Sequence, residues 1–138
     1  MPAPAVAFRQ AVEAGDGEAL RALLADDVRF HSPVAHGEYR GPVAVGGVLQ
    51  AVVAVFEDFA YEDELAAVGD GPHGLVFRAR VGDRQVHGID LLRFAEDGRV
   101  AELTVMLRPL SAVVAVRDAM AAALAAAGVD PKALSGPR

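Results

Sequence analysis

The run of short strand patterns in the second half of the chain constrains the fold more than any other feature. Residues 75–81 alternate apolar and polar side chains, which indicates a strand with one buried face. Gly82-Asp83 and Asp97-Gly98 are turn signals of the kind that join antiparallel neighbours. We therefore expect strands over residues 59–68, 75–81, 85–94 and 100–107.

The first half of the chain favours helices. Gly15 can end one helix and Asp16 can cap the next, because its carboxylate can accept a hydrogen bond from a free helical N–H group. Pro33 ends the one early strand pattern, and the polar loop of residues 36–40 is expected to be irregular. The expected helices cover residues 5–14, a short segment after Asp16, 43–56 and 110–127, and the early strand covers 27–32.

The helix expected over residues 43–56 is unusually apolar. Gln50 is its one strongly polar side chain, so we expect the helix to be buried almost all round. Gly46-Gly47 lies inside it, at a cost of about 1 kcal/mol per glycine relative to alanine. Close approach of the helix to the sheet is the expected reason for this pair.

The order of these elements predicts the fold class. Helices followed by antiparallel strands indicate an α+β fold: a cone-shaped, strongly curved antiparallel or mixed sheet wrapped around N-terminal helices, with an additional C-terminal helix. A cone of this kind has an open mouth that can admit a small ligand. No repeat or linker is visible, so we expect a single domain over residues 1–138 that ends in a frayed tail, residues 129–138.

Composition argues against several classes of protein. The 138-residue chain has a net charge of −6 and no run of Lys or Arg, so it lacks the basic patch of a nucleic-acid-binding protein. No apolar run reaches the roughly 20 residues that span a bilayer, and the N-terminus lacks a basic leader. The absence of cysteine excludes disulfides and a cysteine nucleophile. We expect a cytoplasmic protein that binds neither nucleic acid nor membrane.

Short motifs in both halves share their order and spacing with one known superfamily. They are Ala14-Gly15-Asp16, residues 24–30, Ser32-Pro33-Val34, residues 88–94 and residues 97–100. On these motifs the chain resembles the nuclear-transport-factor-2-like superfamily, in its SnoaL-like and ketosteroid-isomerase-like branch, over about residues 5–110. The resemblance implies a homodimer through the outer face of the sheet, to which Ile89, Leu91 and Met106 would contribute apolar area. This scaffold hosts many activities as well as non-catalytic members.

Two activities of the superfamily lack most of their residues here. A ketosteroid isomerase has a tyrosine on the first helix, an aspartate base before the strand-ending proline and a second aspartate in the penultimate strand. The matching positions are Phe8, Ser32 and Asp90, so only the last group remains. A limonene-epoxide hydrolase has a tyrosine, an asparagine and an aspartate–arginine–aspartate relay, for which only the arginine remains among the matching Phe30, Ser32, Gly82, Arg80 and Val105. The resemblance therefore disfavours both reactions.

Asp90 is the strongest candidate for a functional group. In a strand it shares one face with Val86, Gly88, Leu92 and Phe94, all apolar or small, and the resemblance turns this face towards the pocket. A carboxylate there loses hydration, so its pKa should rise unless a cation compensates. Asp90 could act as a general acid, donate a hydrogen bond to a ligand carbonyl, or form half of an ion pair. The structural alternative is a carboxylate held by a strand arginine.

Two arguments conflict for Arg78 and Arg80. The resemblance turns their face inward, where Arg80 would pair with Asp90 and keep it ionised. The alternation of apolar residues instead turns Leu75 and Phe77 inward and the arginines outward. We expect Arg80 in the pocket and make no prediction for Arg78.

Ser32 lies where this fold often places a catalytic polar group. His31 is its neighbour in the strand and points to the opposite face, which argues against a Ser–His pair. A hydrogen bond to a ligand and a hydroxyl that bonds to the backbone remain as alternatives, the second being favoured. The four histidines form no close metal-ligand pair, so we expect no metal and no cofactor.

The remaining expected site residues surround Asp90. The ligand-binding set contains Gly88, the apolar wall and two loop residues near the mouth: Phe8, Phe30, Leu103, Val105, Leu107, His36 and Tyr39. An apolar wall of this kind is also typical of ordinary core, and the volume of a cavity would distinguish the two. The alanine-rich last helix either covers the mouth or packs on a second subunit.

Together these observations predict a pocket for a small hydrophobic, oxygenated molecule of the polyketide, steroid or terpenoid kind. As an enzyme the protein would be a cofactor-free acid/base isomerase, cyclase or hydrolase, with Asp90 as the acid and Arg80 and Ser32 as helpers. The alternative is a non-catalytic dimerising or ligand-binding module whose cavity is filled by its own side chains.

Overall fold

The computed structural model describes residues 3–126. The tail expected over residues 129–138 lies outside the described residues. Two short helices open the described part, α1 (Ala3–Ala14) and α2 (Gly17–Ala22). Gly15 between them has a φ of 66°, a conformation that glycine adopts without strain. The Asp16 carboxylate accepts a hydrogen bond from the Ala19 N–H at 3.0 Å, as its capping role requires.

Six strands form one curved, mixed sheet in the order β2-β1-β6-β5-β4-β3. β3 to β6 are antiparallel neighbours, as the alternation and the turn signals predict. The strands are β1 (Leu24–His31), β2 (Glu38–Arg40), β3 (Glu57–Leu65), β4 (His73–Val81), β5 (Arg84–Phe94) and β6 (Val100–Arg108). The α+β cone predicted from the sequence is confirmed.

The sheet departs from the sequence predictions at β1 and β2. β1 begins at Leu24 rather than at residue 27, and it runs parallel to β6, with Phe30 opposite Leu103. The loop that was expected to be irregular contains β2, which pairs antiparallel with β1 and sets Tyr39 opposite Phe30. This strand is too short to produce a visible alternation, so no pattern predicted it.

The apolar helix α3 (Pro42–Val55) packs one face on the rest of the molecule, and it is not buried all round. Val45, Val48 and Leu49 are buried, whereas Val43 is 70% exposed. The reason expected for the glycine pair is also wrong. A Cβ on Gly46 would lie 3.5 Å from the Arg21 side chain of α2, so this glycine admits a neighbouring helix and not the sheet.

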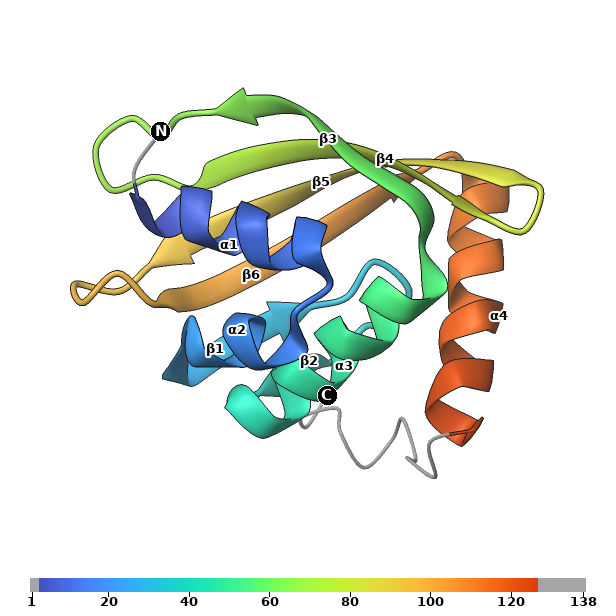
Figure 1. The fold of residues 1–138 in the computed structure, drawn as a ribbon, viewed down its shortest axis with the longest axis horizontal. Coiled ribbons are helices and arrows are strands. Elements are labelled where there is room, and N and C mark those ends of the chain that lie inside the picture. The colour runs from blue at the N-terminus through green and yellow to red at the C-terminus, as the bar shows by residue number, and fades with distance from the viewer. Residues whose placement is uncertain (1–2, 127–138) are drawn as a thin grey trace.

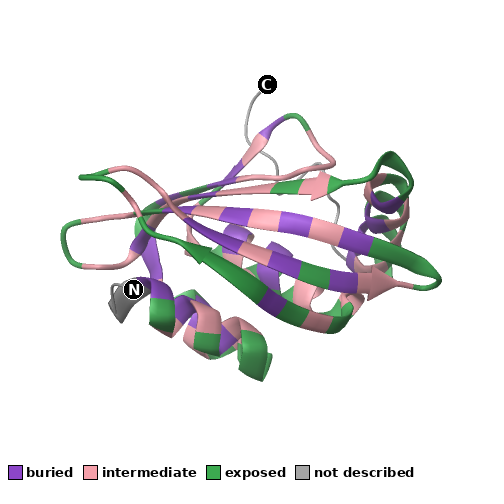
Figure 2. Cartoon of the chain, turned by 90° about the horizontal axis from the view of Figure 1, so that it is seen from above, coloured by how far each residue is buried: buried purple, intermediate pink, exposed green. Residues whose placement is uncertain are grey.

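The elements form two layers and an end wall. Figure 1 shows the sheet arching over α1, α2 and α3, while the last helix, α4 (Leu110–Ala126), stands across one end. α4 contacts α3 and the strands β4, β5 and β6. Buried and exposed positions alternate along the central strands, as the stripes in Figure 2 show, so one face of each strand points to the helices. None of the helices within residues 3–126 has the length and apolar character needed to cross a bilayer.

Candidate functional site

A cavity of about 200 Å³ lies between the inner face of the sheet and the helices. Its lining comes from all four described helices, all six strands and the loop after β1, and almost all of it is apolar. Two charged residues, Asp90 and Arg117, contribute to the lining among the described residues. A concave apolar space with few polar groups is typical of a small-molecule site.

Asp90 lies on the inner face of β5 with its side chain in this cavity lining. It is 7% exposed, and it is the one buried charged residue in the described part of the chain. Val86, Gly88 and Leu92 on the same face are buried too, as the alternation predicts. The Tyr61 hydroxyl donates a hydrogen bond of 2.8 Å to Asp90 Oδ2.

Burial sets the ionisation of this pair. Loss of hydration raises the pKa of Asp90 to about 7, against a smaller opposing effect of the hydrogen bond from Tyr61. Burial and the adjacent carboxylate also raise the pKa of Tyr61, so the phenol stays protonated and acts as a donor. Near neutral pH Asp90 is present both as a neutral acid and as a carboxylate. A carboxyl group whose pKa lies close to the surrounding pH is suited to proton transfer.

Tyr61 is the functional candidate that the sequence analysis missed. It lies on β3, where its neighbours Glu57, Asp58, Glu62 and Glu64 are exposed and conceal any alternation. The available signal was a pair of aromatic residues, Phe59 and Tyr61, two positions apart in an acidic strand, which indicates an inward face because charged residues avoid the core. The Tyr61 ring packs edge-on against Phe59, with centroids 4.9 Å apart.

The apolar wall lies where the sequence analysis placed it. Phe8, Phe30, Leu103, Val105 and Leu107 all line the cavity. Tyr39 also lines it, from β2, with its ring centroid 5.9 Å from that of Phe30. Burial raises the pKa of the Tyr39 hydroxyl, so this group too remains a neutral hydrogen-bond donor.

Gly88 and His36 are not among the lining residues, contrary to expectation. The side chains of Phe77 and Leu107 close over Gly88, so they form the wall and the glycine lies behind them. His36 is exposed in the loop before β2.

Arg80 does not face the pocket, and it does not pair with Asp90. Its guanidinium binds Glu57 at 2.9 Å, Asp58 at 3.1 Å and the Gly82 carbonyl at 2.6 Å. The antiparallel register explains the error: Leu75 lies opposite Asp90, whereas Arg80 lies opposite Gln85 at the far end of β4. The apolar alternation predicted the inward face correctly. Arg78 also points outward and binds Glu62.

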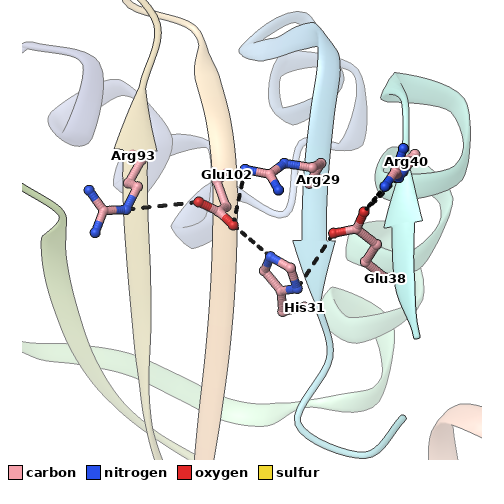
Figure 3. A network of polar contacts seen from close by, with 6 residues as sticks. All are labelled: Arg29, His31, Glu38, Arg40, Arg93 and Glu102. Atoms are coloured by element: carbon pink, nitrogen blue, oxygen red, sulfur yellow. Dashed lines mark hydrogen bonds and ion pairs between the residues drawn. The ribbon is translucent and has the colours of Figure 1, made fainter. Parts of the chain in front are cut away.

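Ser32 lines the cavity, but its Oγ accepts a hydrogen bond from the Val34 N–H at 3.1 Å. This is the backbone role that the sequence analysis favoured, and it leaves the hydroxyl hydrogen available to another acceptor. His31 points to the outer face, where its Nε2 lies 2.7 Å from Glu102 Oε2. Figure 3 shows this network of charged residues across β1, β2, β5 and β6.

The last helix forms part of the pocket. Val116, Met120 and Leu124 are buried and line the cavity along one side of α4. α4 therefore covers one side of the cone. No three His, Asp or Glu side chains gather as metal ligands anywhere in the described part of the chain.

Comparisons with known proteins agree with this geometry. The chain matches the family model of the SnoaL-like domain over residues 5–103. No curated protein matches it. A steroid delta-isomerase from Pseudomonas aeruginosa is 39% identical with a TM-score of 0.86, over 92% of this chain and 96% of that chain.

Two further solved structures are similar. An uncharacterized protein with a cystatin-like fold from Silicibacter pomeroyi DSS-3 is 33% identical with a TM-score of 0.85, over 91% of this chain and 87% of that chain. An NTF-2 like protein of unknown function from Burkholderia xenovorans LB400 is 17% identical with a TM-score of 0.64, over 75% and 79% of the two chains, and shows the fold alone. On the family match and the two closer structures, the chain belongs to the SnoaL-like domain family, within the nuclear-transport-factor-2-like superfamily.

Proposed function

We propose that the protein binds a small apolar carbonyl compound and promotes its enolisation, the step shared by ketone isomerisation and aldol-type cyclisation. The observation that carries this proposal is the Tyr61–Asp90 hydrogen bond of 2.8 Å inside an otherwise apolar cavity. The 39% identity to a protein described as a steroid delta-isomerase supports the same reaction class.

The chemistry follows from the neutral form of Asp90. Its carboxyl O–H donates a hydrogen bond to the ligand carbonyl oxygen, while its other oxygen accepts from Tyr61. As the proton on the adjacent carbon leaves, negative charge grows on the carbonyl oxygen, and a donor in a low-dielectric site stabilises that charge. No second carboxylate or imidazole occurs in the described lining, so water takes the carbon proton. We therefore expect modest catalysis.

The second candidate function is ligand binding without turnover. Ser32 favours it, because its Oγ is bound to the Val34 N–H at the position where an isomerase of this superfamily has its base. A cavity of about 200 Å³ argues against the version of this alternative in which the protein's own side chains fill the pocket.

Binding and proton exchange of 2-tetralone, a two-ring ketone, test the proposal. Because only the neutral acid donates, we expect binding by wild type to be about tenfold weaker at pH 8 than at pH 6, on either side of a pKa of about 7. The Asp90→Asn variant should show no such change, since its amide does not titrate. Exchange of the hydrogens beside the carbonyl, followed by NMR in D2O, should be faster with wild type than with Asp90→Asn.

Two further variants sharpen this test. Arg80→Gln, on the outer surface, should match wild type in both binding and exchange. Ser32→Asp places a carboxylate where the base is missing, and should accelerate exchange if Asp90 already polarises the carbonyl. Binding without exchange in wild type and in Ser32→Asp would identify a non-catalytic module. Identical pH dependence in wild type and Asp90→Asn would rule out Asp90 as the carbonyl partner.

We also propose that the protein forms a homodimer through the outer face of the sheet. Ile89 pairs with Met106 across β5 and β6, and Met106 is 52% exposed there. Charged groups lie on the same sheet, among them Glu102 of β6, which belongs to the network drawn in Figure 3, and Glu62 of β3. A Met106→Glu substitution should convert a dimer to a monomer in sedimentation velocity, because it buries like charges against each other. A wild-type chain that sediments as a monomer at all concentrations would contradict the dimer.

A further inference from the structure

The mouth of the cavity can be placed from the exposure of its walls. Among the described residues that line the cavity, Arg117 and Ala121 are the exposed ones, and the others are buried or half-buried. The two lie four positions apart on α4, and therefore on the same face of this helix. The cavity consequently meets solvent beside this face.

Arg117 brings a positive charge to this opening. Its Nε donates to Asp118 Oδ1 at 3.1 Å, and within residues 3–126 this neighbour in the chain is its only ion-pair partner. A guanidinium carries five N–H donors, so the remaining ones are available to an acceptor at the mouth. The other charged lining residue, Asp90, is buried and is hydrogen-bonded to Tyr61. The cavity therefore has one acidic group in its buried part and one basic group at its exposed edge.

The volume of the cavity limits the size of the ligand. Pockets for drug-sized ligands have volumes of about 300–1,000 Å³, and an apolar cavity of about 150 Å³ holds a single benzene ring. A space of about 200 Å³ therefore suits one or two rings better than four fused rings. Asp90 and Arg117 line the same cavity, so a molecule that fills it contacts both residues.

We propose that the natural ligands are one- or two-ring carbonyl compounds that carry a carboxylate, and that Arg117 binds this carboxylate at the mouth while Asp90 binds the carbonyl oxygen. The inference rests on the proposed function for its carbonyl half. Guanidinium groups pair with carboxylates through two parallel hydrogen bonds, which fixes orientation as well as charge. Arg117 is then a specificity-determining residue that selects acids over neutral ketones of the same size.

A matched pair of probes tests this selection. The first is 6-oxo-5,6,7,8-tetrahydronaphthalene-2-carboxylate, which is 2-tetralone with a carboxylate on its aromatic ring, and the second is its carboxamide; the two have nearly the same shape and differ in charge. At pH 6 and low salt, we expect wild type to bind the carboxylate about fivefold more tightly, the upper range for an exposed ion pair. Arg117→Gln should abolish this preference, and Arg117→Lys should retain part of it. Arg93→Gln removes the same charge from the outer face of the sheet and should leave the preference unchanged.

The outcomes separate this inference from the proposed function. Equal affinity for the carboxylate and the carboxamide in wild type would overturn the role of Arg117, and so would a preference that survives in Arg117→Gln. 2-Tetralone lacks the carboxylate, so its binding should be the same in wild type and Arg117→Gln. If 2-tetralone binds with the expected pH dependence and the acid is not preferred, this inference alone fails. If neither 2-tetralone nor the acid binds, both fail.

Discussion

The Asp90→Asn variant is expected to be more stable than wild type at pH 8, and the difference should nearly disappear at acid pH. Asp90 has its pKa raised from 3.8 to about 7 in the folded protein, so the folded state holds a proton that the unfolded state has lost. Wild-type stability therefore falls as the pH rises between these two values and is lowest above pH 7. The asparagine amide oxygen still accepts the Tyr61 hydrogen bond, and the amide does not ionise.

The size of this effect follows from linkage. Between pH 5 and pH 8, wild type should lose about 3 kcal/mol of unfolding free energy relative to Asp90→Asn, since each pKa unit is worth about 1.4 kcal/mol. Urea titrations at several pH values measure it. Asp83→Asn, in the exposed turn between β4 and β5, serves as the control and should follow wild type. Parallel curves for wild type and Asp90→Asn would show that Asp90 is not a buried acid.

Gly88→Ala should destabilise the protein by roughly 1–3 kcal/mol, in the range found for overpacked cores. A Cβ at this position would lie 2.7 Å from Leu107 Cδ2 and 2.9 Å from the Met106 carbonyl oxygen, and it would also overlap the Phe77 ring. The backbone carbonyl cannot move aside as a side chain can. Phe77 and Leu107 would be displaced into the cavity that they line, so 2-tetralone binding should weaken too.

Gly47→Ala is the matched control for this substitution. Gly47 lies on the exposed side of α3, and a Cβ there would meet nothing within 4 Å. The change should stabilise the protein by about 0.5–1 kcal/mol through helix propensity and leave ligand binding unchanged. Thermal and urea unfolding of the two variants give the comparison. Similar small effects in both would contradict the close packing around Gly88.

The sequence predicted the buried face of a strand correctly wherever apolar and polar side chains alternate without interruption. Along β5 the apolar or small residues at positions 86, 88 and 92 share the face of Asp90, and this pattern, with the family resemblance that turns the face towards the pocket, predicted a buried carboxylate. The same rule applied to β4 turned Phe77 inward and Arg80 outward, and the rule was right where the family resemblance misplaced the arginine. Local periodicity records which face is buried, whereas the register decides which residues meet across strands.

The partner of Asp90 could not be obtained in this way. Tyr61 lies 29 residues before Asp90, on a strand that is separated from β5 by β4. A long aromatic side chain reaches across the intervening strand, and no spacing along the chain encodes this contact. The short strand β2 and the opening beside Arg117 were missed for a related reason, because both depend on how separate elements meet.

The parallel pairing of β1 with β6 has a consequence for how the chain folds. β1 forms a local ladder with β2 on one edge, but its other edge joins β6, and His31 meets Glu102 across 71 residues of chain. Contacts between such distant segments form late, because a long loop must close first. While the chain is being made, β1 therefore exposes an unpaired edge until β6 has been synthesised. An exposed strand edge invites association with other chains, so the nascent chain is most prone to aggregate before β6 is available to pair with β1.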